Sequence, residues 1–406
     1  MKPSLAAIVW MFLLASTASA QGRADDGNWG REYQVSNTGG YSSGSVGRGL
    51  AIDSRGHLHV LWTEVRGSQY DVLYARSTDG GGTWSPGFDL SNSTLPAVGG
   101  NLAVGPDDTL HAAWADRRQG GNQRIYYSRS TNSGASWEAP RDLSGDLGNA
   151  ATPTITVDRR QRVHVAWHTG NPDAALPIAV VFYTHSIDAG ATFTGVARLS
   201  TATGQHAAWP RFNVAGTDGE VVAVAWRDNR RVSDWDIYAA VSTDGGSSFG
   251  ERLVRADSNR EWDPDTVVDP SGQIYVSYMR HGTNSIDIVL VRSRDFGVTW
   301  TAPVVLSEAR SRFPFFAPAW PAGVLALFWK DERDAGADIV CKFSFDGGVT
   351  WSQQEWVTDD ATNETKFPSP ALAGDGRPHV TWSDQRLGAT QEAVFVRSRL
   401  TVPGGR

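Results

Sequence analysis

One short pattern recurs six times along this chain and constrains its fold more than any other feature. The octet Ser77–Trp84, STDGGGTW, returns as STNSGASW, SIDAGATF, STDGGSSF, SRDFGVTW and SFDGGVTW. Measured at the third residue of each octet, the spacings are 53, 56, 56, 51 and 51 residues. A repeat of about fifty residues indicates a propeller, a solenoid or another array of copied units.

Each octet belongs to the same series of β-type segments. An alternating apolar segment such as YDVLYARS precedes the octet, and short apolar segments lie further before it and directly after it. One of them ends in a large aromatic residue seven times, at Trp62, Trp114, Trp167, Trp226, Tyr278, Trp329 and Trp382. Four short strands per unit, without helical periodicity, predict the antiparallel blades of a β-propeller.

The number of blades follows from the two counts together. The seventh unit stops after its third strand, whereas Trp29–Asn37, WGREYQVSN, resembles the WSPGFDLSN segment that follows the first octet. We expect this N-terminal segment to pair with the last unit, because pairing removes an open sheet edge. The sequence thus predicts an all-β propeller of seven four-stranded blades, with six blades and a partial unit as the alternative. Residues 21–406 are expected to form one domain.

The octet itself has the residues of a hairpin turn between the third and fourth strands. Its Asp or Asn side chain can accept hydrogen bonds from turn amides, and its Gly allows a positive φ. The closing Trp or Phe can pack between neighbouring sheets. We therefore interpret the octet as a structural element rather than a catalytic one.

The N-terminus and the composition restrict where the protein acts. Residues 1–20 contain LAAIVWMFLL and end in Ala18-Ser19-Ala20, the pattern of a secretory signal cleaved after Ala20; a retained anchor is the alternative. The 44 acidic and 37 basic residues form no basic tract, which argues against nucleic acid as a partner. Cys341 is the only cysteine, so no intrachain disulfide can form. We expect a secreted or periplasmic monomer without a membrane span.

The pattern S-x-D-x-G-x-T-W resembles the Asp box, or bacterial neuraminidase repeat, of the sialidase superfamily. The resemblance implies a sialidase-like propeller with its Asp boxes on the face opposite the active site. In sialidases an arginine triad holds the substrate carboxylate, a Tyr–Glu pair supplies the nucleophile and an Asp is the acid/base. The Arg-Ile-Pro motif of that family is absent here, and Gly47-Arg48-Gly49-Leu50 is the nearest equivalent. Sialidases also have six blades.

A second motif recurs where the second strands end. Trp114-x-Asp116-x-Arg118 has three further copies and a Glu64 variant, and we interpret it as a turn-stabilising Asp–Arg pair, with a catalytic ring of carboxylates as the alternative. The histidines that precede the repeated Trp are interpreted as structural strand residues: His59, His111, His164 and His379. No metal site or cofactor is predicted.

Candidate site residues come from positions where the repeat breaks. In a propeller, the starts of first strands and the ends of second strands share one face, so the pocket should lie there. Arginines can clamp an acidic sugar and tryptophans offer it a flat surface; the substrate-binding candidates are Arg48, Arg211, Arg312, Arg280, His206, Trp209 and Trp262. Asp263 and Glu261 are candidates for general acid or base, and Tyr278 for a nucleophile activated by a carboxylate. The alternative is that the aromatic residues and the neighbouring prolines fix the entry of the strands, while the arginines are solvated or paired.

Three functions remain open from the sequence. The first is a secreted propeller of the sialidase superfamily that recognises glycans and hydrolyses acidic sugars as an exo-sialidase-type glycoside hydrolase. The second is a non-catalytic carbohydrate-binding module, and the third is an exported scaffold that binds proteins. The sequence does not decide whether the protein is an enzyme.

Overall fold

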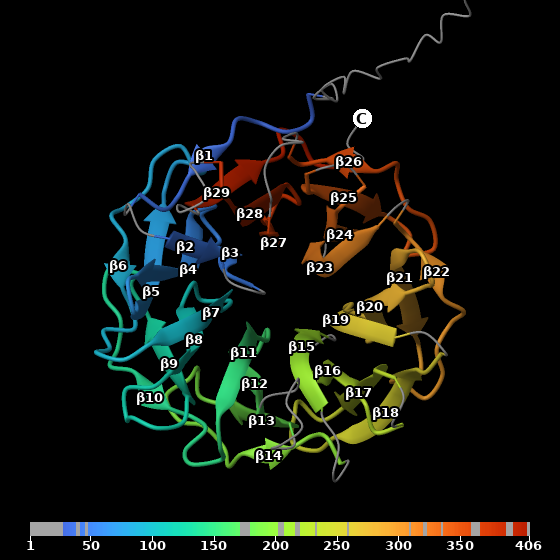
Figure 1. Ribbon diagram of the computed structural model, residues 1–406, viewed down its shortest axis with the longest axis horizontal. Coiled ribbons are helices and arrows are strands. Elements are labelled where there is room, and N and C mark those ends of the chain that lie inside the picture. The colour runs from blue at the N-terminus through green and yellow to red at the C-terminus, as the bar shows by residue number, and fades with distance from the viewer. Residues whose placement is uncertain are drawn as a thin grey trace, which may run out of the picture.

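The computed structural model describes residues 27–37, 41–44, 48–170, 179–201, 207–215, 220–231, 234–257, 260–307, 310–319, 323–333, 336–358, 366–386 and 393–403. The predicted signal peptide lies outside these ranges. Within them, seven antiparallel sheets surround a common centre and no helix occurs (Figure 1). The prediction of an all-β, seven-bladed propeller is confirmed, and the six-bladed alternative is wrong.

Blades I to III begin near the centre and end at the rim (Figure 1). Blade I consists of β2 (Tyr41–Gly44), β3 (Leu50–Ile52), β4 (Leu58–Arg66), β5 (Gln69–Ser77) and β6 (Phe88–Asp89). Blade II consists of β7 (Ala97–Val104), β8 (Leu110–Asp116), β9 (Arg124–Ser130) and β10 (Arg141–Asp142). Blade III consists of β11 (Ala150–Val157), β12 (Val163–Thr169), β13 (Val180–Ser186) and β14 (Ala197–Arg198).

Blades IV to VI repeat this order. Blade IV consists of β15 (Ala207–Ala215), β16 (Val221–Asp228), β17 (Asp236–Ser242) and β18 (Gly250–Arg255). Blade V consists of β19 (Arg260–Val268), β20 (Ile274–His281), β21 (Ile286–Ser293) and β22 (Val304–Val305). Blade VI consists of β23 (Ser311–Ala319), β24 (Val324–Asp331), β25 (Asp338–Ser344) and β26 (Glu355–Trp356).

Blade VII joins the two ends of the chain. It consists of β27 (Lys366–Leu372), β28 (Pro378–Asp384), β29 (Ala393–Ser398) and the N-terminal β1 (Tyr33–Gln34). Tyr33 pairs with Val396, and Trp29 forms a further bridge with Arg399. The predicted closure by the N-terminal segment is confirmed, and blade VII has no unpaired third strand at its rim.

The Asp boxes lie between the third and fourth strands, as predicted. In the first box, Ser77 Oγ donates to Asp79 Oδ1 (2.8 Å), and Gly81 N donates back to Ser77 Oγ (2.8 Å). Thr83 donates to both oxygens of Asp79, from its backbone N (2.9 Å) and from its Oγ1 (2.7 Å). These hydrogen bonds lower the pKa of the Asp79 carboxyl to about 2. The box is a closed hydrogen-bonded turn, which confirms its structural role.

Each of the first three seams between blades is joined by the same contact, which we call the Tyr–Gly latch. The Tyr127 hydroxyl of blade II forms a hydrogen bond with His111 Nδ1 (2.7 Å), and the Tyr127 ring packs against Phe193 of the next Asp box. A Cβ on Gly190 of that box would lie 1.8 Å from the Tyr127 hydroxyl. The equivalent pairs are Tyr74 with Gly134 and Tyr183 with Gly246. Only glycine therefore fits where the tyrosine enters the next box.

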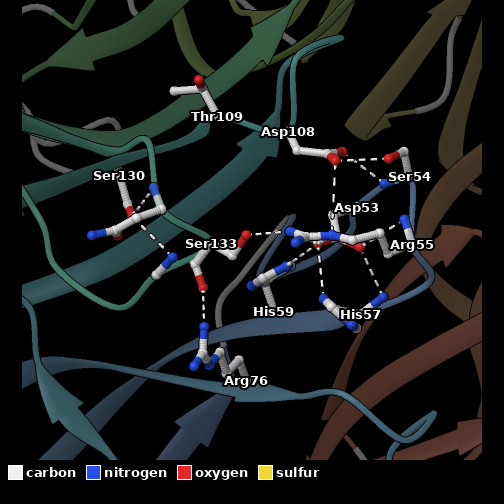
Figure 2. A network of polar contacts seen from close by, with 12 residues as sticks. Asp53, Ser54, Arg55, His57, His59, Arg76, Asp108, Thr109, Ser130 and Ser133 are labelled. Atoms are coloured by element: carbon white, nitrogen blue, oxygen red, sulfur yellow. Dashed lines mark hydrogen bonds and ion pairs between the residues drawn. The ribbon is translucent and has the colours of Figure 1, made fainter.

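Polar contacts reinforce the seam between blades I and II (Figure 2). Asp53 binds Arg55 and His57, Ser54 donates to Asp108 of the next blade (2.7 Å), and Arg76 Nη1 donates to the carbonyl of Ser133 (2.8 Å). The repeated histidines of blades I, II and VII are buried, which lowers the pKa of His59, His111 and His379 to about 4. They are structural residues, as predicted.

The repeated Trp-x-Asp-x-Arg motif is also structural. The buried Asp116 carboxylate accepts hydrogen bonds from Trp114 Nε1 (3.1 Å) and from Arg118 Nη2 (2.6 Å). The same Asp–Arg pairs occur at the ends of β16, β24 and β28. The prediction of a turn-stabilising pair is confirmed in these four blades.

Candidate functional site

The face opposite the Asp boxes, which we call the mouth, is shaped by an irregularity in the first strands. In blades II to VII the pairing of the first and second strands shifts register near the start of the first strand. Residues with positive φ stand at this shift in five blades: Gly99, Thr152, Asp263, Phe313 and Phe367. Positive φ is unfavourable for residues other than glycine, so the bulges need surrounding structure to hold them.

A stack of four side chains forms one wall of the mouth between blades IV and V. The buried Arg227 guanidinium lies between two indoles, with its Cζ 4.4 Å from the ring centroid of Trp235 and 4.7 Å from that of Trp262. His281 lies on Trp262, with ring centroids 5.3 Å apart. A cation between two aromatic faces is favourable, so Arg227 stabilises the positions of Trp235 and Trp262 in this wall.

Cationic groups gather beside this wall in blade VI. Arg312 Nε and Arg310 Nε lie 2.9 and 3.5 Å from the same Oε2 of Glu332, and Lys330 Nζ lies 3.1 Å from Oε1. Among these four side chains, positive charge exceeds negative charge. Burial, followed by the charges of Arg312, Arg260 and Arg310, lowers the pKa of His281, which is neutral at pH 7.

Aromatic residues continue the mouth from blade VI to blade VII. Phe313 and Phe367, both at positive φ, contact each other with ring centroids 4.9 Å apart. Both side chains are half-buried. The mouth therefore combines flat apolar surfaces with arginines, which can bind anionic groups.

Glu261 and Tyr278 are close together but lie beneath the mouth. Glu261 is the second residue of β19 and is fully buried; burial, and then repulsion from Asp257 and Asp236, raises its pKa to about 8. Tyr278 replaces the repeated Trp of the other blades and is buried between blades IV and V, where burial and the Glu261 charge raise its pKa. Neither the Tyr278 hydroxyl nor Glu261 Oε2 has a hydrogen-bond partner among the described residues.

Arg48 extends across the centre of the propeller. Its backbone N donates to Asn101 of blade II (2.9 Å), and its Nη2 lies 3.6 Å from the buried Asp265 of blade V. Together with Leu50, Leu102, Ile155 and Phe316, Arg48 lines a central cavity of about 200 Å³. Arg48 and Arg312 thus bind different carboxylates, Asp265 in the channel and Glu332 at the mouth.

The structure describes some of the remaining predicted site residues completely and others only in their backbone or not at all. Asp263 is half-buried at the bulge of β19, and Arg280 pairs with Asp287 (2.9 Å). Arg211 and Trp209 lie in β15, where Arg211 pairs with Ala225, and their side chains are outside the described part of the structure. His206 lies outside the described residues. The convergence of Arg48, Arg211 and Arg312 on one anion stays a prediction.

The sequence reasoning missed several residues of the mouth. Arg227 and Lys330 stand directly after the repeated Trp, where other blades have Thr63 or Ala115, so comparing that position between blades would have identified them. Trp235 and Arg310 had no such signal, because they lie in connections that differ between the units. Glu332 is recognised only by its cationic neighbours.

The described residues contain neither a metal-binding cluster nor a membrane-spanning helix. No group of His, Cys, Asp and Glu side chains there could hold a metal ion. No helix in the same ranges has the length and apolarity to cross a membrane.

Comparison with known proteins places the chain among similar folds. A sequence profile of the BNR repeat-like domain matches residues 108–380, more than half of the chain. No curated protein sequence matches it. Three similar solved structures are a PL25 ulvan lyase bound to -[GlcA(1-4)Rha3S]- (TM-score 0.63, 13% identity, covering 91% of this chain and 94% of that one), an α-L-arabinofuranosidase from Fusarium graminearum (0.52, 13%, 74% and 92%) and a Hadza microbial sialidase (0.51, 15%, 84% and 73%). At these identities the similarity shows the fold alone.

Proposed function

This chain belongs to the BNR repeat-like domain family, and from that premise we propose that it is an exported propeller that binds acidic glycans at the mouth of blades IV to VI. The carboxylate or sulfate of the sugar would bind Arg310 and Arg312, and the sugar ring would lie against Trp262 or the Phe313–Phe367 pair.

The observation that carries this proposal is the sharing of Glu332 by Arg310 and Arg312. Against the effect of burial, hydrogen bonds with Lys330 and Arg312 hold the pKa of Glu332 below its ordinary value, so the carboxylate is ionised and orients the arginines. Two guanidinium groups with one acidic partner can accept a second anion without losing the first, and arginine matches carboxylate and sulfate groups in planar, two-point contacts.

The names of structurally similar proteins support the same class of ligand. The repeat -[GlcA(1-4)Rha3S]- bound by the ulvan lyase carries both a carboxylate and a sulfate, and another similar protein is a sialidase. These activities belong to those proteins, and they suggest which glycans to test first.

Hydrolysis of the bound glycan is the second candidate function. It is favoured by the position of Glu261 beside Tyr278. Because burial raises the pKa of both groups, that of Glu261 to about 8, Glu261 must first lose its proton before it can accept the proton of the Tyr278 hydroxyl. In this mechanism Asp263 is the acid/base and Tyr278 the nucleophile. Since Tyr278 and Glu261 are enclosed between blades, a substrate would have to displace part of the mouth to reach them, whereas recognition at the surface needs no such change.

The binding proposal is tested by calorimetric titration of the purified protein with a GlcA–Rha3S oligosaccharide and a sialoside. Arg312→Ala is expected to weaken binding about tenfold or more, because it removes hydrogen bonds between charged groups. Arg117→Ala, which removes an exposed arginine from blade II on the same face, is the matched control and should change affinity less than twofold. Equal effects of the two substitutions would contradict the proposal.

Turnover is measured on the same ligands and on fluorogenic glycosides. If the protein releases the fluorophore from a glycoside, and Asp263→Asn abolishes that release while leaving affinity unchanged, the protein is a hydrolase that uses Asp263. If the wild-type protein binds a glycan and forms no product from it, the mouth is a binding site only.

A further inference from the structure

The face that carries the Asp boxes is not uniform, and its irregular part lies in blade V. The second residue of the box is Arg294 there, whereas the other boxes have Thr78, Thr131, Ile187, Thr243 and Phe345. Arg294 is exposed, and its Nε donates to Oε1 of the buried Gln273 (2.6 Å). No carboxylate of the described residues forms an ion pair with it. A neutral amide therefore orients this guanidinium and leaves its charge uncompensated.

Two cavities open on either side of this arginine. One of about 320 Å³ lies between blade V and the Asp box of blade VI, and its lining includes Asp269, Tyr275 and Gly347. The other, of about 430 Å³, is lined by Arg292, Thr299, Trp300 and Thr301. Gln273 and Arg294 line both. The Asp269 carboxylate accepts hydrogen bonds from the neutral hydroxyls of Ser271 and Tyr275, so its negative charge remains in the first cavity. The lining of the second cavity contains both arginines and no carboxylate, so Arg292 and Arg294 set its charge.

Arg292 has a structural role and adds positive charge to the second cavity. Its Nη1 donates to the carbonyl of Gly347 (2.7 Å), as Arg76 and Arg129 do to the carbonyls of the boxes that follow them. This repeated contact holds the seam between two blades. Arg294 has no such repeated contact, so the blade-to-blade comparison separates the two arginines.

Phe296 is the second irregular residue of the same box. Its φ is 57°. At the same position of the other boxes, positive φ is adopted by smaller residues: Gly80, Ser133, Ala189, Gly245 and Gly347. A phenylalanine in this region is strained, and 45% of its surface is exposed to solvent, so little burial offsets the strain. Val298 and Phe345 are also more than half exposed nearby in the chain or in the next box. Phe296 lies two residues after Arg294 in the same turn, and an exposed aromatic ring at positive φ is a costly arrangement there.

We propose that the Asp-box face of blade V carries a second glycan-binding site, in which Arg294 binds the anionic group of a sulfated or carboxylated sugar and the ring of Phe296 packs against the sugar. This proposal rests on the proposed function only in its choice of ligand class, acidic glycans. Because it lies on the opposite face from the mouth, it would hold another part of the same polymer, or a second chain, away from the first site.

The test uses the full-length mature protein carrying Arg312→Ala, so that binding at the mouth is weakened. A GlcA–Rha3S oligosaccharide is titrated by calorimetry at low salt, with and without the further substitution Arg294→Ala. We expect Arg294→Ala to weaken the remaining binding about tenfold. The matched control is Arg377→Ala, an arginine of similar exposure on the Asp-box face of blade VII whose charge is neutralised by Asp375; it should change affinity less than twofold.

A second variant tests the role of the aromatic ring. Phe296→Gly removes the ring and the backbone strain together, so it should weaken glycan binding while leaving the melting temperature unchanged or higher. The proposal is overturned if Arg294→Ala and Arg377→Ala act equally, if no acidic oligosaccharide binds the Arg312→Ala protein, or if inorganic sulfate binds as tightly as the oligosaccharide. Failure at the mouth is recognised separately, because Arg312→Ala would then leave the first binding event unchanged.

Discussion

Blade II and blade V are built from the same unit, but they differ in whether their equivalent buried polar groups have hydrogen-bond partners. In blade II, Trp114 Nε1 donates to Asp116, Arg118 binds the same carboxylate, and the Tyr127 hydroxyl binds His111. In blade V, Tyr278 replaces the Trp and Arg280 replaces the Asp, and the Tyr278 hydroxyl and Glu261 Oε2 lack partners among the described residues. An unsatisfied buried polar group costs about 1–3 kcal/mol. At these positions blade V therefore gives up stability that blade II keeps, and it does so directly beneath the mouth.

The largest expected effect comes from disrupting the regular Tyr–Gly latch between blade II and blade III. Gly190→Ala places a Cβ 1.8 Å from the Tyr127 hydroxyl at a φ of 80°. Steric overlap and backbone strain together should lower the free energy of unfolding by about 4 kcal/mol. Gly120→Ala has a similar φ of 74° but open space around it, and should cost about 1 kcal/mol from strain alone. Urea denaturation measures both; equal losses would mean that the Tyr–Gly latch contributes nothing.

The second prediction uses the opposite pH dependence of the two regions. Glu261 has a pKa of about 8 in the folded protein against 4.5 ordinarily, so the folded state prefers the protonated form and stability falls as pH rises from about 5 to 8. Asp79, Asp188, Asp295 and Asp346 of the Asp boxes have their pKa lowered to about 2, so they stabilise above pH 4, and this is lost as pH falls towards 2.

Glu261→Gln tests the first half of this dependence. The variant should be more stable than the wild type by about 2–3 kcal/mol at pH 8 and similar to it at pH 5, because only the ionised form of Glu261 is unfavourable. Thermal denaturation from pH 3 to pH 9 gives the two profiles. If they run parallel, Glu261 does not titrate in this range. The fall below pH 4 should persist in both proteins.

The smallest expected effect compares two buried tyrosines. Tyr127→Phe leaves His111 Nδ1 without its partner and should cost about 1–2 kcal/mol. Tyr278→Phe removes a hydroxyl that has no hydrogen bond, so stability should stay within about 0.5 kcal/mol or rise. Chemical denaturation at pH 6 resolves the difference. A comparable loss in both variants would show that blade V satisfies its polar groups after all.

The sequence alone determined the architecture. Octets, aromatic strand ends and the WGREYQVSN segment gave the blade count and the closure, because blades I to VI each form their sheet and their Asp box from contacts that are local in the chain, and blade VII lacks only the strand that this segment supplies. The same comparison between units separated the structural Asp116 and His111 from positions such as Arg312 and Asp263, which depart from the repeat.

Only the tertiary structure decided which of the residues that depart from the repeat contact one another. Arg227, Trp235, Trp262 and His281 stack across a seam, and Arg48 reaches Asp265 of blade V through the centre of the ring. The sequence also suggested Tyr278 as a mouth residue, whereas the fold buries it between two sheets. These contacts join residues of different units, and their geometry depends on how the blades pack around the axis. No spacing within a single unit encodes that packing.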